Sequence, residues 1–402
     1  MNIRLEVQLH EIATITANRY KEVPHIGVLG GKSGIALFQF YCSKYFNQDI
    51  YADNGLKILE DCIENINKGY INSPYCGGLA GFGWVIQHLH DQEFLDLPAD
   101  EILSSMDTLL LQQMRKELSN KYLDFLHGAI GYGFYFLKRY KGTKNDRLKN
   151  QYVSCLTELI NGIKENALFE NNTIFWKSTL DARVGNKGCN LSLAHGMAGI
   201  INFLVRMATI PSLKNDCNIL LRGASNFIVD FYNKSNKECV SLFPSWIEED
   251  SIPEYDSRLA WCYGDLGIGK SLELAAMEIE NNELEKQALE ILEESAKRVD
   301  ASNTRVIDAG ICHGSFGNFL FFNEINNQHP SSKFREAMDF WINDGLSKCT
   351  DNPKEPYLQW QGKDLEWRFE LNVLEGVSGI GLCIIDYLSD EKNNWSECLL
   401  LC

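Results

Sequence analysis

A Gly-x-x-Gly motif recurs seven times along this chain of 402 residues. The first glycines of the copies lie 47 to 68 residues apart, and they are Gly31, Gly78, Gly128, Gly196, Gly264, Gly314 and Gly376. A unit that recurs with variable insertions indicates a repeat architecture. Glycine favours turns in which the backbone takes a positive φ or approaches another segment closely. The sequence therefore predicts seven equivalent turns.

Apolar residues follow most of these motifs almost without interruption. Examples are the runs 35–41, 134–137, 200–205, 319–322 and 380–385. A helix that is apolar on all sides has no face for solvent, so these runs predict buried inner helices. Between the motifs, apolar residues recur at spacings of three and four, which is typical of amphipathic helices. Three such sets are Leu56, Leu59, Ile63 and Ile66; Leu148, Tyr152, Cys155 and Leu159; and Phe334, Ala337, Met338, Trp341 and Leu346.

Seven pairs of one outer and one inner helix predict the fold class. We expect residues 1–402 to form a single all-α domain, an α/α toroid with seven inner and seven outer helices. The segments 163–194 and 233–257 interrupt the repeat, and their aromatic and β-branched runs at 172–176 and 239–246 predict short strands or loops on the rim. Loops on a rigid scaffold are a usual place for substrate contacts.

Composition excludes several classes of protein. The formal net charge is −16, and no Lys/Arg block is interleaved with aromatic residues, which argues against nucleic acid as a partner. We expect no signal peptide, because Arg4, Glu6 and Glu11 interrupt the N-terminal apolar positions, and no transmembrane helix, because no stretch of about 18 residues is apolar and uncharged. The 13 cysteines form no tight framework. We therefore expect reduced thiols and a cytoplasmic location.

Two of the motifs carry residues that bind metal ions. Cys262 and Cys312 each stand two residues before the first glycine of a motif, and His313 stands one residue before it. If the two turns are equivalent in space, the three side chains face one another. Two thiols and an imidazole predict a zinc site with an open fourth position, the arrangement of catalytic zinc. The alternative is two packed cysteines beside a turn histidine.

Other turns place polar side chains in the same register. Cys76 also stands two residues before its glycine, as a further ligand candidate or a packed thiol. His127 and His195 share the position of His313 and are candidates for acid–base chemistry. Asp124, four residues before its glycine, is a candidate partner for such a histidine or a turn cap.

Arg258 precedes Cys262 by four residues. Such an arginine can bind a carbonyl or carboxylate beside a metal. It can also simply pair with Asp256 or Asp265.

At these residues the chain resembles the lanthionine synthetase C-like family, the lantibiotic cyclases. The resemblance covers essentially the whole chain, and its sharpest parts are 261–264, 312–314 and 194–196. It implies an α/α toroid with Zn²⁺ held by Cys262, Cys312 and His313. It also implies that Asp124, His195, Arg258 and Tyr263 are catalytic. The chain is similar to the stand-alone type of cyclase, which implies a dehydrated precursor peptide as substrate and a separate dehydratase and an export transporter as further partners.

The resemblance implies a reaction that suits these residues. A cysteine of the peptide adds to dehydroalanine or dehydrobutyrine and forms a lanthionine or methyllanthionine ring. Zinc would supply the thiolate, which a free thiol with a pKa of about 8.5 provides poorly at neutral pH. We expect Arg258 to stabilise the enolate and His195, oriented by Asp124, to protonate it, with Tyr263 as a second donor.

Two other functions remain open at this point. The zinc-dependent protein prenyltransferases also use an α/α barrel, but their ligands include a carboxylate and they need a partner subunit. A non-catalytic zinc and thiol binding protein, similar to the glutathione-binding relatives of the family, would keep the same three ligands.

Overall fold

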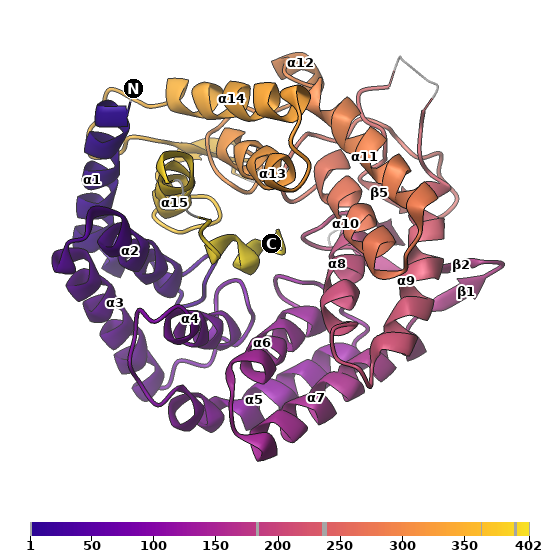
Figure 1. Ribbon diagram of the computed structural model, residues 1–402, viewed down its shortest axis with the longest axis horizontal. Coiled ribbons are helices and arrows are strands. Elements are labelled where there is room, and N and C mark those ends of the chain that lie inside the picture. The colour runs from indigo at the N-terminus through magenta and orange to yellow at the C-terminus, as the bar shows by residue number, and fades with distance from the viewer. Residues whose placement is uncertain (1, 182–184, 235–238, 363, 390–391, 402) are drawn as a thin grey trace.

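The helices of the computed structural model form two concentric rings (Figure 1). The structure describes residues 2–181, 185–234, 239–362, 364–389 and 392–401. Each repeat contributes one outer and one inner helix, so the predicted α/α toroid with seven of each is confirmed. Among the described helices, none combines the length and the apolar character needed to cross a membrane.

Every inner helix begins directly after the first glycine of a motif. These helices are α2 (Lys32–Phe46), α4 (Leu79–Asp91), α6 (Ala129–Gly142), α8 (Met197–Met207), α10 (Asp265–Glu278), α13 (Ser315–Gln328) and α15 (Val377–Leu388). In all seven the glycine is the N-cap, and a Cβ atom there would overlap backbone atoms of the segment that approaches the turn. Only Gly264 takes a positive φ, of 100°. Close approach of the backbone therefore explains the repeated glycine.

The outer helices are amphipathic and lie around the inner ring. They are α1 (Asn2–Arg19), α3 (Asp49–Asn67), α5 (Ala99–Ser119), α7 (Asp146–Glu165), α9 (Lys214–Val229), α11 (Asn282–Ala296) and α14 (Ser332–Ser347). Side chains cap three of their N-termini, since Asn145, Asn281 and Ser331 accept hydrogen bonds from the first turns of α7, α11 and α14. Short helices complete the set: η1 (Tyr20–Glu22), α12 (Ala301–Thr304) and η2 (Trp395–Leu399).

The predicted buried face of α3 is partly wrong. Leu59 is buried, but Leu56 and Ile63 are 42% and 43% exposed. Ile58 and Cys62 are fully buried instead, and Gly55 lies against the ring of Phe40 in α2. Two overlapping sets of residues in this helix satisfy the same spacing, and close packing on α2 selects the set that contains glycine. The faces predicted for α7 and α14 are confirmed, with Tyr152 and Trp341 buried at their centres.

The described part of the chain also forms three small antiparallel sheets. They are β1 (Leu168–Glu170) with β2 (Thr173–Phe175); β3 (Ser178–Asp181), β4 (Asn186–Asn190) and β5 (Trp246–Glu248); and β6 (Gln359–Gln361) with β7 (Glu366–Arg368). The predicted strand at 172–176 corresponds to β2, which with β1 projects outward from the ring (Figure 1). The run 239–246 is loop up to the start of β5 at Trp246. The sheet between α14 and α15 was not predicted.

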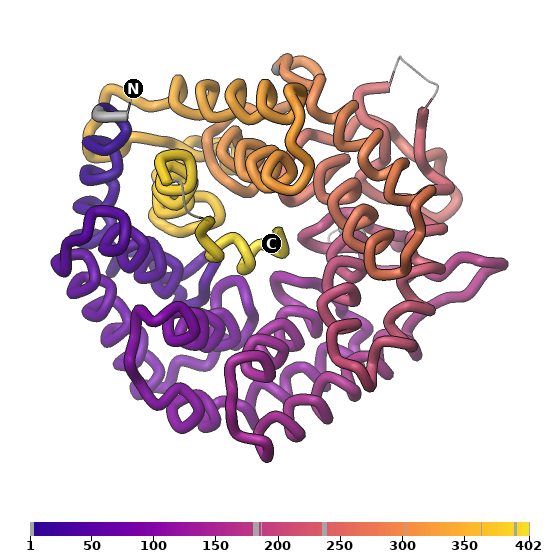
Figure 2. Tube along the Cα trace, in the orientation of Figure 1, coloured from indigo at the N-terminus to yellow at the C-terminus, as the bar shows by residue number. Residues whose placement is uncertain are grey.

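Among the described residues, backbone hydrogen bonds join neighbouring turns around the ring except between the third and the fourth. Each bond uses the residue that stands two positions before the first glycine. The bonds run from the nitrogen to the oxygen of Leu29–Cys76 (3.1 Å), Cys76–Leu126 (2.9 Å), Ala194–Cys262 (3.3 Å), Cys262–Cys312 (3.1 Å), Cys312–Leu374 (2.8 Å) and Leu374–Leu29 (2.9 Å). The last bond connects the seventh turn to the first, where the indigo and yellow ends of the chain lie side by side (Figure 2).

The last described residues lie inside the ring, near its centre (Figure 1). The indole Nε1 of Trp261 donates to the carbonyl oxygen of Leu399 at 2.9 Å. The hydroxyl of Tyr75 donates to the carbonyl oxygen of Cys398 at 3.2 Å. Leu399 and Leu400 are fully buried. This segment therefore supports two of the turns from the centre of the molecule.

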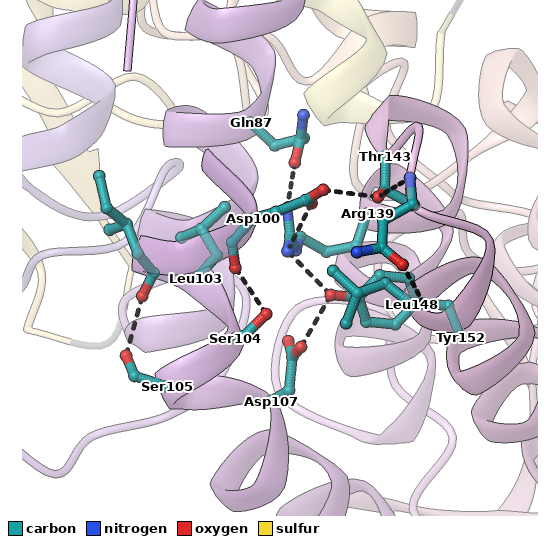
Figure 3. A network of polar contacts seen from close by, with 12 residues as sticks. Gln87, Asp100, Leu103, Ser104, Ser105, Asp107, Arg139, Thr143, Leu148 and Tyr152 are labelled. Atoms are coloured by element: carbon teal, nitrogen blue, oxygen red, sulfur yellow. Dashed lines mark hydrogen bonds and ion pairs between the residues drawn. The ribbon is translucent and has the colours of Figure 1, made fainter. Parts of the chain in front are cut away.

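A buried polar network joins inner and outer helices at the end of α6 opposite its glycine turn (Figure 3). Arg139, in the last turn of α6, bonds to Gln87 of α4, to Tyr152 of α7 at 2.8 Å and to Asp100 of α5 at 3.1 Å. Tyr152 in turn donates to Asp107 at 2.8 Å. Arg139 is fully buried, so its charge needs these partners. The network fixes the helix ends far from the turns that carry the candidate site.

Candidate active site

Cys262, Cys312 and His313 come together at the ends of the fifth and sixth turns. Their candidate ligand atoms all lie within 4.8 Å of one another, and no other group of this kind occurs among the described residues. The backbone bond from Cys262 nitrogen to Cys312 oxygen, 3.1 Å long, aligns the two turns. The predicted equivalence of the turns in space is therefore confirmed.

Asp308 holds the imidazole of His313. Its Oδ2 lies 3.0 Å from His313 Nε2, which leaves Nδ1 as the nitrogen available to a metal. The carboxylate is itself fixed, because Oδ1 accepts from Gly310 nitrogen at 3.1 Å and Oδ2 accepts from Trp360 nitrogen at 3.2 Å. Asp308 is 1% exposed. Metal-binding histidines commonly carry such a carboxylate on their second nitrogen.

The three side chains of the cluster differ in their pKa shifts. A hydrogen bond from the Cys312 thiol, together with the adjacent His313, lowers the pKa of Cys262 well below its usual value despite burial. The same bond and burial raise the pKa of Cys312. Burial opposes the charge on His313, but Asp308 and Cys262 outweigh it and raise the pKa of His313 to about 10. The cluster thus already stabilises one thiolate among its three side chains.

The donor set fits zinc. Zinc–sulfur bonds of about 2.3 Å and zinc–nitrogen bonds of about 2.0 Å require ligand atoms about 3.5 to 4 Å apart in a tetrahedron. The 4.8 Å limit on the present separations leaves only a small contraction. Two thiols, one imidazole and a carboxylate behind the imidazole are a combination that zinc prefers.

Asp124 and His195 form a hydrogen-bonded pair in the neighbouring third and fourth turns. His195 Nδ1 lies 2.6 Å from Asp124 Oδ2, and Asp124 Oδ1 accepts from the backbone nitrogen of His127 at 2.8 Å. The carboxylate therefore acts both as a turn cap and as a partner of His195. Burial lowers the pKa of His195, but the bond and charge of Asp124, together with Cys262, raise it above its ordinary value.

The pair lies beside the candidate metal-binding cluster. Ala194, which precedes His195, donates from its backbone nitrogen to the carbonyl oxygen of Cys262 at 3.3 Å. With Nδ1 engaged by Asp124, Nε2 of His195 is the atom available to a substrate.

Tyr263 lies between the two groups. Its ring centroid is 5.9 Å from that of His195, and its hydroxyl accepts from Asn190 Nδ2 at 3.1 Å. Burial raises the pKa of Tyr263, so its hydroxyl stays a neutral donor. The ring of Trp246 packs edge-on against Tyr263, with centroids 6.1 Å apart.

Arg258 is exposed on the rim of the site. The simple ion pairs considered for it do not form, because Asp256 pairs with Arg305 at 3.0 Å and Asp265 with Arg298 at 2.7 Å. Among the described residues, Arg258 makes no ion pair of its own. Its charge contributes to the lowered pKa of Cys262, which places it near the sulfur.

Cys76 and His127 have different surroundings. Cys76 lies outside the cluster, and burial raises the pKa of its thiol to about 12, as in a packed thiol. The ring of His127 stacks near that of His195 with centroids 6.4 Å apart, and burial lowers its pKa.

The sequence analysis missed Asp308 and Asn190. Both stand six residues before the first glycine of their turns, the position that Arg258 occupies in the fifth turn. This position is polar in all seven repeats, as His25, Asn72, Tyr122, Asn190, Arg258, Asp308 and Glu370. A comparison of the repeats at that position would have marked both residues as candidates for the rim of the site.

Comparison with known proteins agrees with this arrangement. A model of the family described as lanthionine synthetase C-like protein matches residues 27–400. The nisin biosynthesis protein NisC of Lactococcus lactis subsp. lactis is 23% identical over 392 residues, which are 92% of this chain and 88% of that protein. Among solved structures, nisin cyclase superposes with a TM-score of 0.77 at 20% identity, over 99% of this chain and 98% of the other. The seven-repeat ring and the match over nearly its whole length show that this chain belongs to the lanthionine synthetase C-like family.

Proposed function

We propose that this protein is a zinc-dependent peptide cyclase. It adds cysteine thiols to dehydroalanine or dehydrobutyrine within one ribosomal precursor peptide and so forms lanthionine and methyllanthionine rings. The observation that carries the proposal is the Cys262–Cys312–His313 cluster beside the hydrogen-bonded pair of Asp124 and His195. Family membership and the likeness to a protein named for nisin biosynthesis support a lanthionine synthetase type of enzyme.

Zinc would be held by Cys262, Cys312 and His313, with Asp308 behind the histidine. Bound there, it would supply Lewis-acid chemistry that lowers the pKa of a thiol.

The remaining residues act on the other end of the new bond. Addition of the thiol across the double bond places negative charge on the carbonyl oxygen beside it, and the unpaired guanidinium of Arg258 can stabilise this charge. The α-carbon then takes a proton from Nε2 of His195, whose imidazolium form Asp124 favours. The S–H bond and the π bond of the alkene break while one C–S and one C–H bond form, the proton released by the thiol replaces the one that His195 gives up, and no electrons are gained or lost. Tyr263 supplies a second neutral donor.

The test begins with metal content measured by mass spectrometry on purified, reduced protein. We expect about one zinc per chain in the wild type and none in Cys312→Ala. Cys76→Ala is the matched control, because Cys76 has the same register but lies outside the cluster. Loss of zinc from the control, or no zinc in the wild type, would overturn the assignment.

Activity is then measured on a synthetic peptide with one cysteine and one dehydroalanine, as loss of reactivity toward a thiol-alkylating reagent at unchanged mass. We expect ring closure by the wild type and none above the uncatalysed rate by Cys312→Ala. His195→Asn should retain zinc but lose about 10²- to 10⁴-fold in kcat, the usual contribution of general acid catalysis. A wild-type protein that binds zinc and the thiol tripeptide glutathione but closes no rings would favour the non-catalytic thiol-binding alternative.

We also propose the setting of the reaction. The substrate is a precursor peptide dehydrated by a separate dehydratase, the location is the cytoplasm, and an export transporter receives the product. The resemblance to the stand-alone type of cyclase supports this proposal.

A further inference from the structure

A cavity of about 230 Å³ opens on the rim beside the candidate active site. Apolar side chains and carboxylates share its wall, and the principal ones are Trp246, Ile252, Pro253, Glu248, Glu254 and Asp256. We call it the Trp246 pocket. The described residues that line it include no lysine or arginine.

Trp246 joins this pocket to the catalytic residues. It begins β5 and pairs with Asn190 at the end of β4, and Asn190 donates to the hydroxyl of Tyr263 at 3.1 Å. The indole is 46% exposed, and its ring meets Tyr263 edge-on at 84°. One side chain is therefore both a wall of the pocket and a neighbour of the catalytic tyrosine.

The charge of the pocket is negative and incompletely neutralised. Glu254 makes no ion pair with any described residue, whereas Glu248 has a partner and Asp256 is matched by the exposed Arg305. Lys177, another nearby cation, pairs with Glu249 at 2.8 Å. The formal net charge of −16 adds to the attraction for a cation.

We propose that the Trp246 pocket is a subsite for a lysine or arginine side chain of the substrate peptide. This inference rests on the proposed function and adds to it a preference for basic residues near the reacting groups. The apolar stem of such a side chain packs on Trp246, Ile252 and Pro253, while the charged head reaches the carboxylates. An exposed indole also attracts a cation over its face.

The test uses synthetic peptides with one cysteine and one dehydroalanine. They differ in one residue, which is lysine, glutamine or glutamate, placed in turn at each position next to the two reacting residues. At one of these positions or more, kcat/KM should be about 3- to 10-fold higher for lysine than for glutamine, the range of an exposed ion pair with a cation–π contact. The difference should lie mainly in KM, because it reflects binding rather than chemistry.

Variants of Glu254 make the test specific. Glu254→Gln should reduce the preference for lysine, and Glu254→Lys should favour the glutamate peptide instead. Glu336→Gln, an equal change of charge at an exposed position of α14, is the control and should leave the preference unchanged. Trp246→Ala should raise KM for the lysine peptide more than for the glutamine peptide.

The possible failures are distinguishable. If the wild type closes rings at equal rates with all peptides, or if Glu254→Lys keeps the preference for lysine, the subsite is overturned while the proposed function stands. If the wild type closes no ring in any peptide, the proposed function fails and the subsite falls with it.

Discussion

Asp124 illustrates how much can depend on a single side chain. One of its oxygens caps the third turn at His127, and the other holds Nδ1 of His195 in the fourth turn at 2.6 Å. Among the described residues, no backbone hydrogen bond joins these two turns as one joins the others. The side-chain bond takes that place in the ring, so a residue proposed for catalysis also completes the structure that carries it.

The first prediction concerns the pH dependence of ring closure. His195 must be protonated to act as an acid, so activity should be lost as pH rises through its raised pKa. Asp124→Asn removes the charge that favours the imidazolium, and we expect the alkaline limb of kcat/KM to move to lower pH. The loss should be greatest at alkaline pH and smallest near pH 6. Rates measured from pH 6 to 10 check this, and an unchanged alkaline limb would contradict the role given to Asp124.

At the residue scale, the sequence predicted the three metal-binding candidates because residue type and position relative to the glycine motif can both be read from the sequence. Asp308 and Asn190 were missed, although their position in the repeat is regular. Asp308 bonds to a histidine of its own turn, whereas Asn190 bonds to Tyr263 of the next turn. Which partner a polar side chain reaches depends on its rotamer and on the packing of adjacent turns, and neither can be derived from spacing alone.

At the scale of the element, the glycine turn sets where each inner helix begins. Gly264 is the most demanding of the seven, because it combines a positive φ with a position at which an added Cβ would lie 2.0 Å from the carbonyl oxygen of Arg258. Gly69 also has a positive φ, of 94°, but open space surrounds the position of a Cβ. Substitutions at the two glycines therefore distinguish the cost of conformational strain from that of steric overlap.

We predict that Gly264→Ala destabilises the protein by more than about 2 kcal/mol and weakens zinc binding. Backbone strain at a positive φ costs an alanine about 1 to 3 kcal/mol, and Gly264, with φ 100° and ψ −168°, lies in a region that is essentially restricted to glycine. The overlap with Arg258 must also be relieved by a backbone shift next to Cys262. Gly69→Ala should lose only the first contribution and keep its zinc. Urea denaturation and metal content measure the two effects, and equal destabilisation by both variants would show that the turn has room to relax.

The pairing of inner and outer helices could be predicted because burial on all sides and burial on one side leave different patterns. The buried face of α3 could not, since Leu56 and Ile58 belong to overlapping sets with the same spacing. The sheet of β6 and β7 was also not predicted. It nevertheless bears on the site, because the backbone of Trp360 holds Asp308.

At the scale of the whole molecule, the ring closes through the bond between Leu374 and Leu29, and α1 packs against α15. We keep the prediction that residues 1–402 are a single domain, and thermal unfolding tests it. Zinc that binds only the folded ring should stabilise it by about 4 kcal/mol when the free metal exceeds its dissociation constant a thousandfold. Removing the metal with a chelator should therefore lower the unfolding temperature by several degrees.

Calorimetry of the zinc-loaded, metal-free and Cys312→Ala proteins measures this shift. We expect one cooperative transition in each, at a similar temperature for the last two. Two separated transitions would contradict the single domain, and an unchanged temperature after chelation would contradict the coupling of zinc binding to folding.

The closure of the ring also sets an order of events during synthesis. The amide of Cys312 cannot form its hydrogen bond until Leu374 has been synthesised. The indole of Trp261, next to Cys262, likewise needs the carbonyl oxygen of Leu399. A nascent chain can therefore hold all three candidate metal-binding residues before the last of their supports leaves the ribosome. Zinc loading and the first turnover would then come only after Leu399 has been synthesised, so that a shorter nascent chain does not act on the precursor peptide.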